Sequence, residues 1–82
     1  MFEIYDKSIA SDFAGYGIES LIVQNGVILA HVRTWDNPQV VEDDFKATLT
    51  GKAVAERGNG WRKLQGQKAE NAQAWAKDIC QS

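Results

Sequence analysis

Few side chains in this sequence have the chemistry of a nucleophile or a general base. Cys80 is the only cysteine and His31 the only histidine among the 82 residues. A nucleophilic thiol needs a base within hydrogen-bonding reach and a third group that orients this base. We expect His31 in the middle of a strand and Cys80 near the end of a helix, and no sequence feature brings them together. The sequence therefore predicts no catalytic residues, and we interpret Cys80 as a small hydrophobic residue at the edge of the core.

The metal-binding side chains are equally sparse. One cysteine and one histidine cannot supply the ligand set of a zinc site. Glu42, Asp43 and Asp44 are consecutive, so they point in different directions from a helix and lack the spaced acids and glycine of an EF-hand. They are better explained as negative charges near a helix N-terminus, where the helix dipole favours them. We therefore predict no metal site and no cofactor.

Two glycine-containing stretches can be compared with phosphate-binding motifs. At Gly51-Lys52 the P-loop pattern fails, because Lys46 stands where an earlier glycine is needed and Ala53 where a Ser or Thr is needed. Residues 58–60 lack the third glycine and the strand-to-helix setting of a dinucleotide fingerprint. We interpret residues 58–60 as a turn.

The segment from Arg57 to Lys63 is more promising. It places Arg57, Arg62 and Lys63 around Trp61, and cations beside an aromatic ring suit recognition of a nucleic-acid backbone with base stacking. The chain as a whole is acidic, with a net charge of −2 and a pI near 5.2, whereas nucleic-acid-binding domains are usually basic. Three interpretations stay open: Trp61 fixes this segment to the core, the segment contacts an acidic protein, or it contacts nucleic acid.

The charges are unevenly distributed along the chain. Residues 1–44 contain two basic and eight acidic side chains, a net charge of −6, and residues 45–82 contain seven basic and three acidic ones, a net charge of +4. An uneven charge distribution affects how a protein attracts its binding partners, but it does not indicate which fold the chain adopts. We expect the two halves to attract each other in the folded protein.

The strongest structural signal is Asn25-Gly26, which separates two runs rich in β-branched residues, 18–24 and 27–35. A two-residue Asn-Gly turn suits the positive φ angles of a type I′ hairpin. Its register pairs residues whose numbers sum to 51. One face of the hairpin then carries three opposed pairs, which we assign to the core: Val23 with Ile28, Leu21 with Ala30, and Glu19 with Val32.

The opposite side of the hairpin, here called the mixed face, interleaves apolar and polar residues. Two helices can cover only one side of a small sheet, and an exposed apolar patch commonly marks an interface. We therefore predict that a second copy or another protein binds there. The predicted contact residues are Ile22, Leu29, His31, Arg33 and Trp35. The alternative is that residues 8–17 or the segment around Trp61 fold over the mixed face and form a second small core.

The remaining elements complete a single domain over residues 1–82. Apolar and polar side chains alternate over residues 2–6, which predicts a short strand, and residues 8–17 are predicted to form a connector. Asn37-Pro38 begins a helix that ends at Gly51 or near Arg57. Its predicted packing stripe is Val41, Phe45, Leu49 and Ala53. Residues 61–66 are ambiguous, and a second helix runs from residue 68 to about 80. The order predicts an α+β fold, a three-stranded antiparallel sheet with two helices on one face.

Composition and layout narrow the function class. No apolar run is long enough to cross a bilayer, and Glu3 and Asp6 stand where a secretory signal carries positive charge, so we expect a cytoplasmic protein without membrane contact. In size and layout the chain resembles small phage-encoded inhibitors, including anti-CRISPR proteins, which implies occlusion of a partner. Our leading hypothesis is a non-enzymatic protein-binding module of this inhibitor type. The alternatives are an accessory nucleic-acid-binding protein that uses Arg57, Trp61, Arg62 and Lys63, and a small enzyme whose site forms on oligomerisation.

Overall fold

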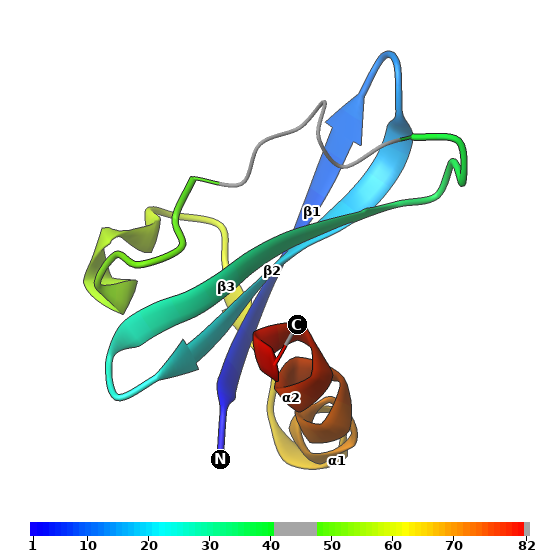
Figure 1. Cartoon of the computed structure of the whole chain (residues 1–82). Helices are drawn as coiled ribbons and strands as arrows, with labels where there is room; N and C mark the ends of the chain where they lie inside the picture. The colour runs from blue at the N-terminus through cyan, green and yellow to red at the C-terminus, as the bar shows by residue number, and fades with distance from the viewer. Residues whose placement is uncertain (41–47, 82) are drawn as a thin grey trace.

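A four-stranded antiparallel sheet organises the fold (Figure 1). The computed structural model describes residues 1–40 and 48–81. The strand order is β3-β2-β1-β4, where the strands are β1 (Glu3–Ser11), β2 (Gly15–Gln24), β3 (Val27–Trp35) and β4 (Arg62–Lys63). One bent helix, made of α1 (Gly66–Asn71) and α2 (Gln73–Gln81), packs against the sheet. The predicted α+β class is confirmed, but the sheet has four strands rather than three.

The predicted hairpin turn between β2 and β3 is confirmed. Asn25 and Gly26 have φ angles of 54° and 77°, and Gln24 pairs with Val27 on either side of them. Positive φ at both central positions is the requirement of a type I′ turn.

Residues 8–17, predicted as a connector, instead complete a second hairpin. Ser11 pairs with Gly15, which has a φ angle of 80°. The Ser11 Oγ accepts hydrogen bonds from the backbone N–H groups of Phe13 and Ala14, each 3.2 Å long. Residues 12–14 thus form a three-residue hairpin loop, and the positive φ at Gly15, the first residue of β2, favours glycine there. The strands β1 and β2 are consequently long and pair along their whole length.

A β-bulge in β3 changes the predicted faces of this strand. Val23 faces Ile28, as predicted, but the next pair is Ile22 with Ala30, which leaves Leu29 as an extra residue on β3. One inserted residue moves all later side chains of a strand to the opposite face. The predicted pairs of Leu21 with Ala30 and of Glu19 with Val32 are therefore wrong. Leu21 pairs with His31, and Glu19 pairs with Arg33.

One side of the sheet, here called the helix face, packs against the bent helix. Its buried centre consists of Ile4, Ile22 and Ala76. Around this centre lie partly buried apolar residues from the N-terminus before β1, from β3, from the segment after β4 and from the helix, namely Phe2, Ala30, Leu64, Ala72, Ile79 and Cys80. The predicted C-terminal helix is confirmed, and Cys80 lies at the edge of the core as expected.

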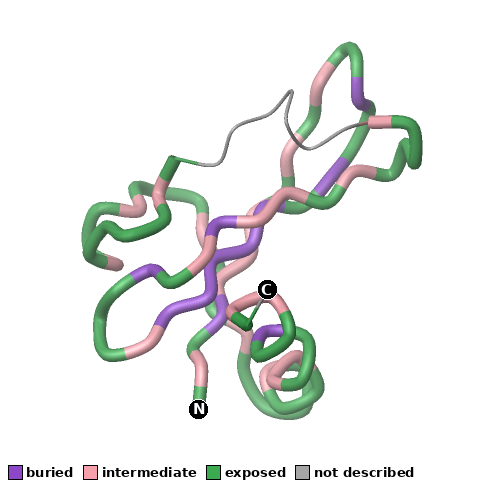
Figure 2. The backbone as a smooth tube through the Cα atoms, in the orientation of Figure 1, coloured by how far each residue is buried: buried purple, intermediate pink, exposed green. Residues whose placement is uncertain are grey.

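The other side, here called the loop face, is covered by residues 48–61 instead of a helix. Leu21, Val23 and Ile28 are fully buried there, beneath Tyr5, Leu49, Val54 and Trp61. Three backbone hydrogen bonds fix this segment to the start of β3: Ile28 N–H to Lys52 O (2.9 Å), Gly51 N–H to Ile28 O (2.8 Å) and Val54 N–H to Gly26 O (2.8 Å). Figure 2 shows the buried residues along the middle of the sheet, between these two covers.

The predicted helix after Asn37 can be checked only in part. The Asn37 side-chain oxygen accepts a hydrogen bond from Gln39 N–H at 3.0 Å, as a capping residue would. Residues 48–53 form turns and a bridge, and a short 3-10 helix, η2, spans Val54–Arg57. The predicted stripe residues Val41 and Phe45 lie outside the described residues. So do the three acidic residues 42–44.

Candidate binding site at the β1–β4 edge

The five predicted contact residues do not form one surface. Ile22 has no exposed area beneath the bent helix. His31 and Arg33 lie on the loop face because of the bulge, and Leu29, at the bulge itself, is 39% exposed. Trp35 is half-buried beside its cross-strand partner Gly17. The mixed face is therefore divided: Ile22 is buried under the bent helix, whereas Ile18, Val27 and Leu29 are 48%, 42% and 39% exposed. The alternative cover does not form on this side either, because the segment around Trp61 packs on Leu21, Val23 and Ile28 of the opposite face.

A buried polar cluster explains the place of His31. Glu19 Oε1 lies 2.7 Å from Arg33 Nε and 3.2 Å from His31 Nε2. Leu49 N–H donates to His31 Nδ1 at 3.1 Å. Because Nδ1 accepts this bond, a neutral imidazole carries its proton on Nε2 and donates it to Glu19. Burial lowers the pKa of His31, although the neighbouring Glu19 carboxylate opposes this shift. The cluster links β2 and β3 to the segment that covers the loop face.

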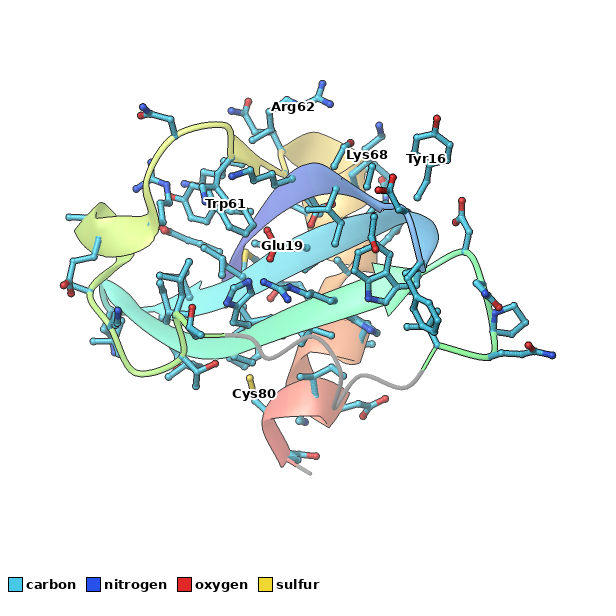
Figure 3. The ribbon with its side chains drawn as sticks, turned by 90° about the horizontal axis from the view of Figure 1, so that it is seen from above. Tyr16, Glu19, Trp61, Arg62, Lys68 and Cys80 are labelled. Atoms are coloured by element: carbon cyan, nitrogen blue, oxygen red, sulfur yellow. The ribbon has the colours of Figure 1, made fainter. Side chains whose placement is uncertain are left out.

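The basic segment predicted from the sequence divides into two parts. Trp61 turns toward the sheet (Figure 3), where its Nε1 donates to Arg57 O at 2.8 Å and its ring lies edge-on to His31 at 5.9 Å. The Arg57 guanidinium lies 4.7 Å from the centre of the Tyr5 ring and donates to Val54 O at 3.0 Å. Arg57 and Trp61 are thus engaged in contacts within the chain, which favours the first of the three interpretations for these two residues.

Arg62 and Lys63, in contrast, are exposed and line a pocket of about 310 Å³ together with Lys7 and Lys68. The pocket lies where β4 meets α1, and Figure 3 shows Arg62 and Lys68 along the same edge of the molecule. Its remaining lining comes from β1, β2 and the segment after β4, as Asp6, Ser8, Ile18, Leu64 and Gln65. Lys7 and Lys68 were not among the predicted site residues; Lys7 joins this pocket because β4 pairs with β1.

The charges in this pocket are only partly neutralised. Asp6 accepts a 2.8 Å hydrogen bond from Ser20 Oγ, and Lys63 lies 3.5 Å from Glu3. The Lys7 ammonium lies 5.6 Å from the centre of the Trp61 ring. Within residues 1–40 and 48–81, Arg62 and Lys68 form no ion pair. The pocket therefore offers two exposed cations to a ligand, above a lining that contains a single carboxylate.

Exposed apolar side chains lie next to the pocket. Ile18, which lines it, is 48% exposed, and Tyr16, two residues earlier on the same face of β2, is 74% exposed. This part of the β1–β2 hairpin extends beyond the bent helix (Figure 1), so the helix does not cover it. The arrangement combines apolar contact area with positive charge at its border, which is the composition of a binding surface.

The described residues contain no group of three or more His, Cys, Asp or Glu side chains that could hold a metal ion. None of their helices is long and apolar enough to cross a membrane. Comparison of the chain with protein-family models, curated proteins and solved structures finds no match.

Proposed function

We propose that the protein is a non-enzymatic binding module that holds an acidic segment of a partner protein in the pocket at the β1–β4 edge. The observation that carries the proposal is the pair of exposed cations, Arg62 and Lys68, beside the half-exposed Ile18. A carboxylate can accept two parallel hydrogen bonds from an arginine, and Ile18 can pack against the apolar part of the same segment. Occupying an acidic segment would block its other contacts, as the inhibitor hypothesis requires.

Nucleic acid has less support as the ligand. Arg57 and Trp61, two of the four residues assigned to it, make contacts within the chain. The chain also has a net charge of −2, so positive potential is local rather than spread along a strip that could follow a phosphate backbone. A compact pocket of about 310 Å³ suits a few carboxylate side chains better than an extended polyanion.

Binding through exposed ion pairs has a recognisable signature. Each such pair contributes about 0–1 kcal/mol, so several pairs and the apolar contact must act together. The pairs are also screened by salt, because the Debye length is about 8 Å at physiological ionic strength. We therefore expect modest affinity that weakens as salt is added.

The test uses the whole protein and a defined probe. The ¹⁵N-labelled protein is titrated with an acetylated and amidated peptide of alternating glutamate and valine, and amide shifts are followed by NMR. We expect the largest shifts at Ser8, Ile18 and Lys68, and loss of binding in the double variant Arg62→Glu/Lys68→Glu. The matched control, Lys52→Glu/Lys77→Glu, changes the net charge equally at exposed positions outside the pocket, and should bind as the wild type does.

Two results would contradict the proposal. Equal weakening by both double variants would mean that the peptide senses only the net charge. Tighter binding of a single-stranded oligonucleotide, abolished by the same Arg62→Glu/Lys68→Glu change, would identify nucleic acid as the ligand.

A further inference from the structure

Among the residues that the structure describes, strand β1 has an unpaired edge beyond the point where β4 ends. β4 pairs with β1 only at two positions, Tyr5 with Lys63 and Asp6 with Arg62, and Leu64 N–H donates to Ile4 O at 2.8 Å just beyond them. β1 continues to Ser11 and pairs with β2 on its other side throughout. Within the described residues, no strand pairs with residues 7–11 on the β4 side.

The backbone groups at this edge can be assigned from the pairing. In an antiparallel sheet, the N–H and C=O groups of one residue point to the same neighbour, and successive residues alternate between neighbours. Ile4 O points to the β4 side, so Asp6, Ser8 and Ala10 direct their backbone groups there as well. Ser8 and Ala10 are exposed, and neither makes a backbone hydrogen bond to the described loops. Within the described residues, their four backbone groups therefore have no strand partner.

The course of the chain explains why this edge stays free. Gly58 and Gly60 have φ angles of 80° and 91°, values that favour glycine. A Cβ built on Gly60 would lie 3.3 Å from Lys7 Cε, so the chain meets the edge of the sheet beside Lys7. It enters β4 at Arg62 and runs away from Ser8 and Ala10.

We infer that the acidic partner segment binds as an additional β-strand along residues 8–11 of β1. The inference rests on the proposed function, because the cations that select an acidic segment lie beside this edge: Ser8 lines the pocket together with Arg62 and Lys68, and Ala10 follows two residues further along β1. An added strand obtains affinity from main-chain hydrogen bonds and specificity from alternate side chains. Here the side chains on the helix face of the added strand approach Arg62 and Lys68, so acidic residues are favoured at every second position.

A second copy of the chain fits this edge less well. Pairing β1 with the same strand of another copy would bring two sets of cations together, since Lys7, Arg62 and Lys68 surround the edge in each copy. Like charges that face each other across an interface disfavour association. The charge of the pocket therefore selects an acidic segment of a different protein.

The first test removes the edge hydrogen bonds without changing any charge. Ala10→Pro deletes an N–H that points away from β2, and proline is tolerated at such positions of edge strands. The control Ala10→Val keeps the N–H and adds a side chain of similar size. We expect Ala10→Pro to weaken the glutamate-valine peptide at least tenfold and Ala10→Val to bind within about twofold of the wild type. If Ala10→Pro does not fold, Ser8→Pro and Ser8→Val provide the same comparison.

The second test varies the peptide. In the same glutamate-valine peptide with N-methylated glutamate residues, the charges are kept, but the backbone N–H groups that would face β1 are lost and strand pairing is blocked. We expect the wild-type protein to bind it at least tenfold more weakly than the glutamate-valine peptide, and the Ala10→Pro variant to bind both peptides equally weakly.

The outcomes separate the two proposals. If both peptides bind the wild type equally well, or if Ala10→Pro binds like Ala10→Val, strand addition is wrong and the acidic-ligand pocket stands. If neither peptide binds, both proposals fail. If sedimentation shows dimers that Ala10→Pro dissociates, the edge serves a second copy and the inference is overturned.

Discussion

Glu19 illustrates how a charged side chain can be stable inside a small domain. It is 7% exposed, and its carboxylate faces a guanidinium at 2.7 Å and an imidazole at 3.2 Å. A buried carboxylate needs such partners, because leaving it unpaired costs several kcal/mol. Glu19 lies on the core side of the hairpin, as predicted, but the predicted partner, Val32, is wrong. The bulge supplies Arg33 as the cross-strand partner instead.

The protonation of His31 provides a prediction at this scale. Burial lowers the pKa of His31 in the folded protein, so the unfolded chain, with a pKa of about 6.5, takes up the proton first as the pH falls. The free energy of unfolding should be constant above this pH and decrease below it, by at most about 1.4 kcal/mol per pH unit. Urea titrations between pH 5.5 and 7.5 measure this slope.

The matched variant for this experiment is His31→Gln, which cannot titrate in that range. Its stability should be lower than that of the wild type, because glutamine loses the edge contact of the imidazole with the Trp61 ring. It should, however, show no slope between pH 5.5 and 7. A wild type as insensitive to pH as His31→Gln would mean that the imidazole is not held neutral by burial.

At the scale of elements, the sequence predicted correctly the turn that depends on local residue preferences. It did not predict the features that depend on pairing between distant segments. Asn25-Gly26 predicted its hairpin because both residues tolerate the positive φ of the turn. The bulge at Leu29 has no such signature, since any β-branched run can accommodate an extra residue. This one residue reversed the faces of His31 and Arg33, and with them the predicted contact surface. Likewise, β4 is two residues long and depends on its pairing with β1, so residues 61–66 were ambiguous.

The attachment of the helix to the sheet supports a second prediction. The Gln73 side chain accepts a hydrogen bond from Phe2 N–H at 2.8 Å and donates to Phe2 O at 2.9 Å. It therefore pairs with the residue before β1 as a neighbouring strand would. Gln73→Ala should lower the free energy of unfolding by about 1–3 kcal/mol, because two part-buried backbone groups lose their partner.

Gln67 offers the control for this change. Its side chain is exposed and donates only to Asn71 within the same helix, so Gln67→Ala should alter stability by less than about 0.5 kcal/mol. Equal urea midpoints for Gln73→Ala and Gln67→Ala would show that the glutamine does not fix the N-terminus to the helix.

At the scale of the whole molecule, the sheet has two covers of different kinds. The helix protects Ile4 and Ile22, and the irregular segment 48–61 protects Leu21, Val23 and Ile28. Attraction between the acidic residues 1–44 and the basic residues 45–82 contributes little to this arrangement. Within the described residues, Glu3 and Lys63 form the one ion pair between these two halves of the chain. The excess cations of the second half are instead available at the pocket, where Arg62 and Lys68 have no such partner among the described residues.

Because the two covers bury only part of β2 and β3, the loss of stability caused by an introduced glutamate should depend on its position in these strands. Ile22 has no exposed area and contacts the helix, whereas Leu29 at the bulge is 39% exposed. Ile22→Glu would bury a carboxylate without a partner, at a cost comparable with the roughly 4–12 kcal/mol that stabilises a domain of this size. We expect Ile22→Glu to be unfolded by circular dichroism, and Leu29→Glu, which can direct its carboxylate to water, to fold with a loss below about 1.5 kcal/mol. A folded, soluble Ile22→Glu protein that had lost only its partner or its oligomeric state would contradict the two-cover arrangement and restore Ile22 as a contact residue.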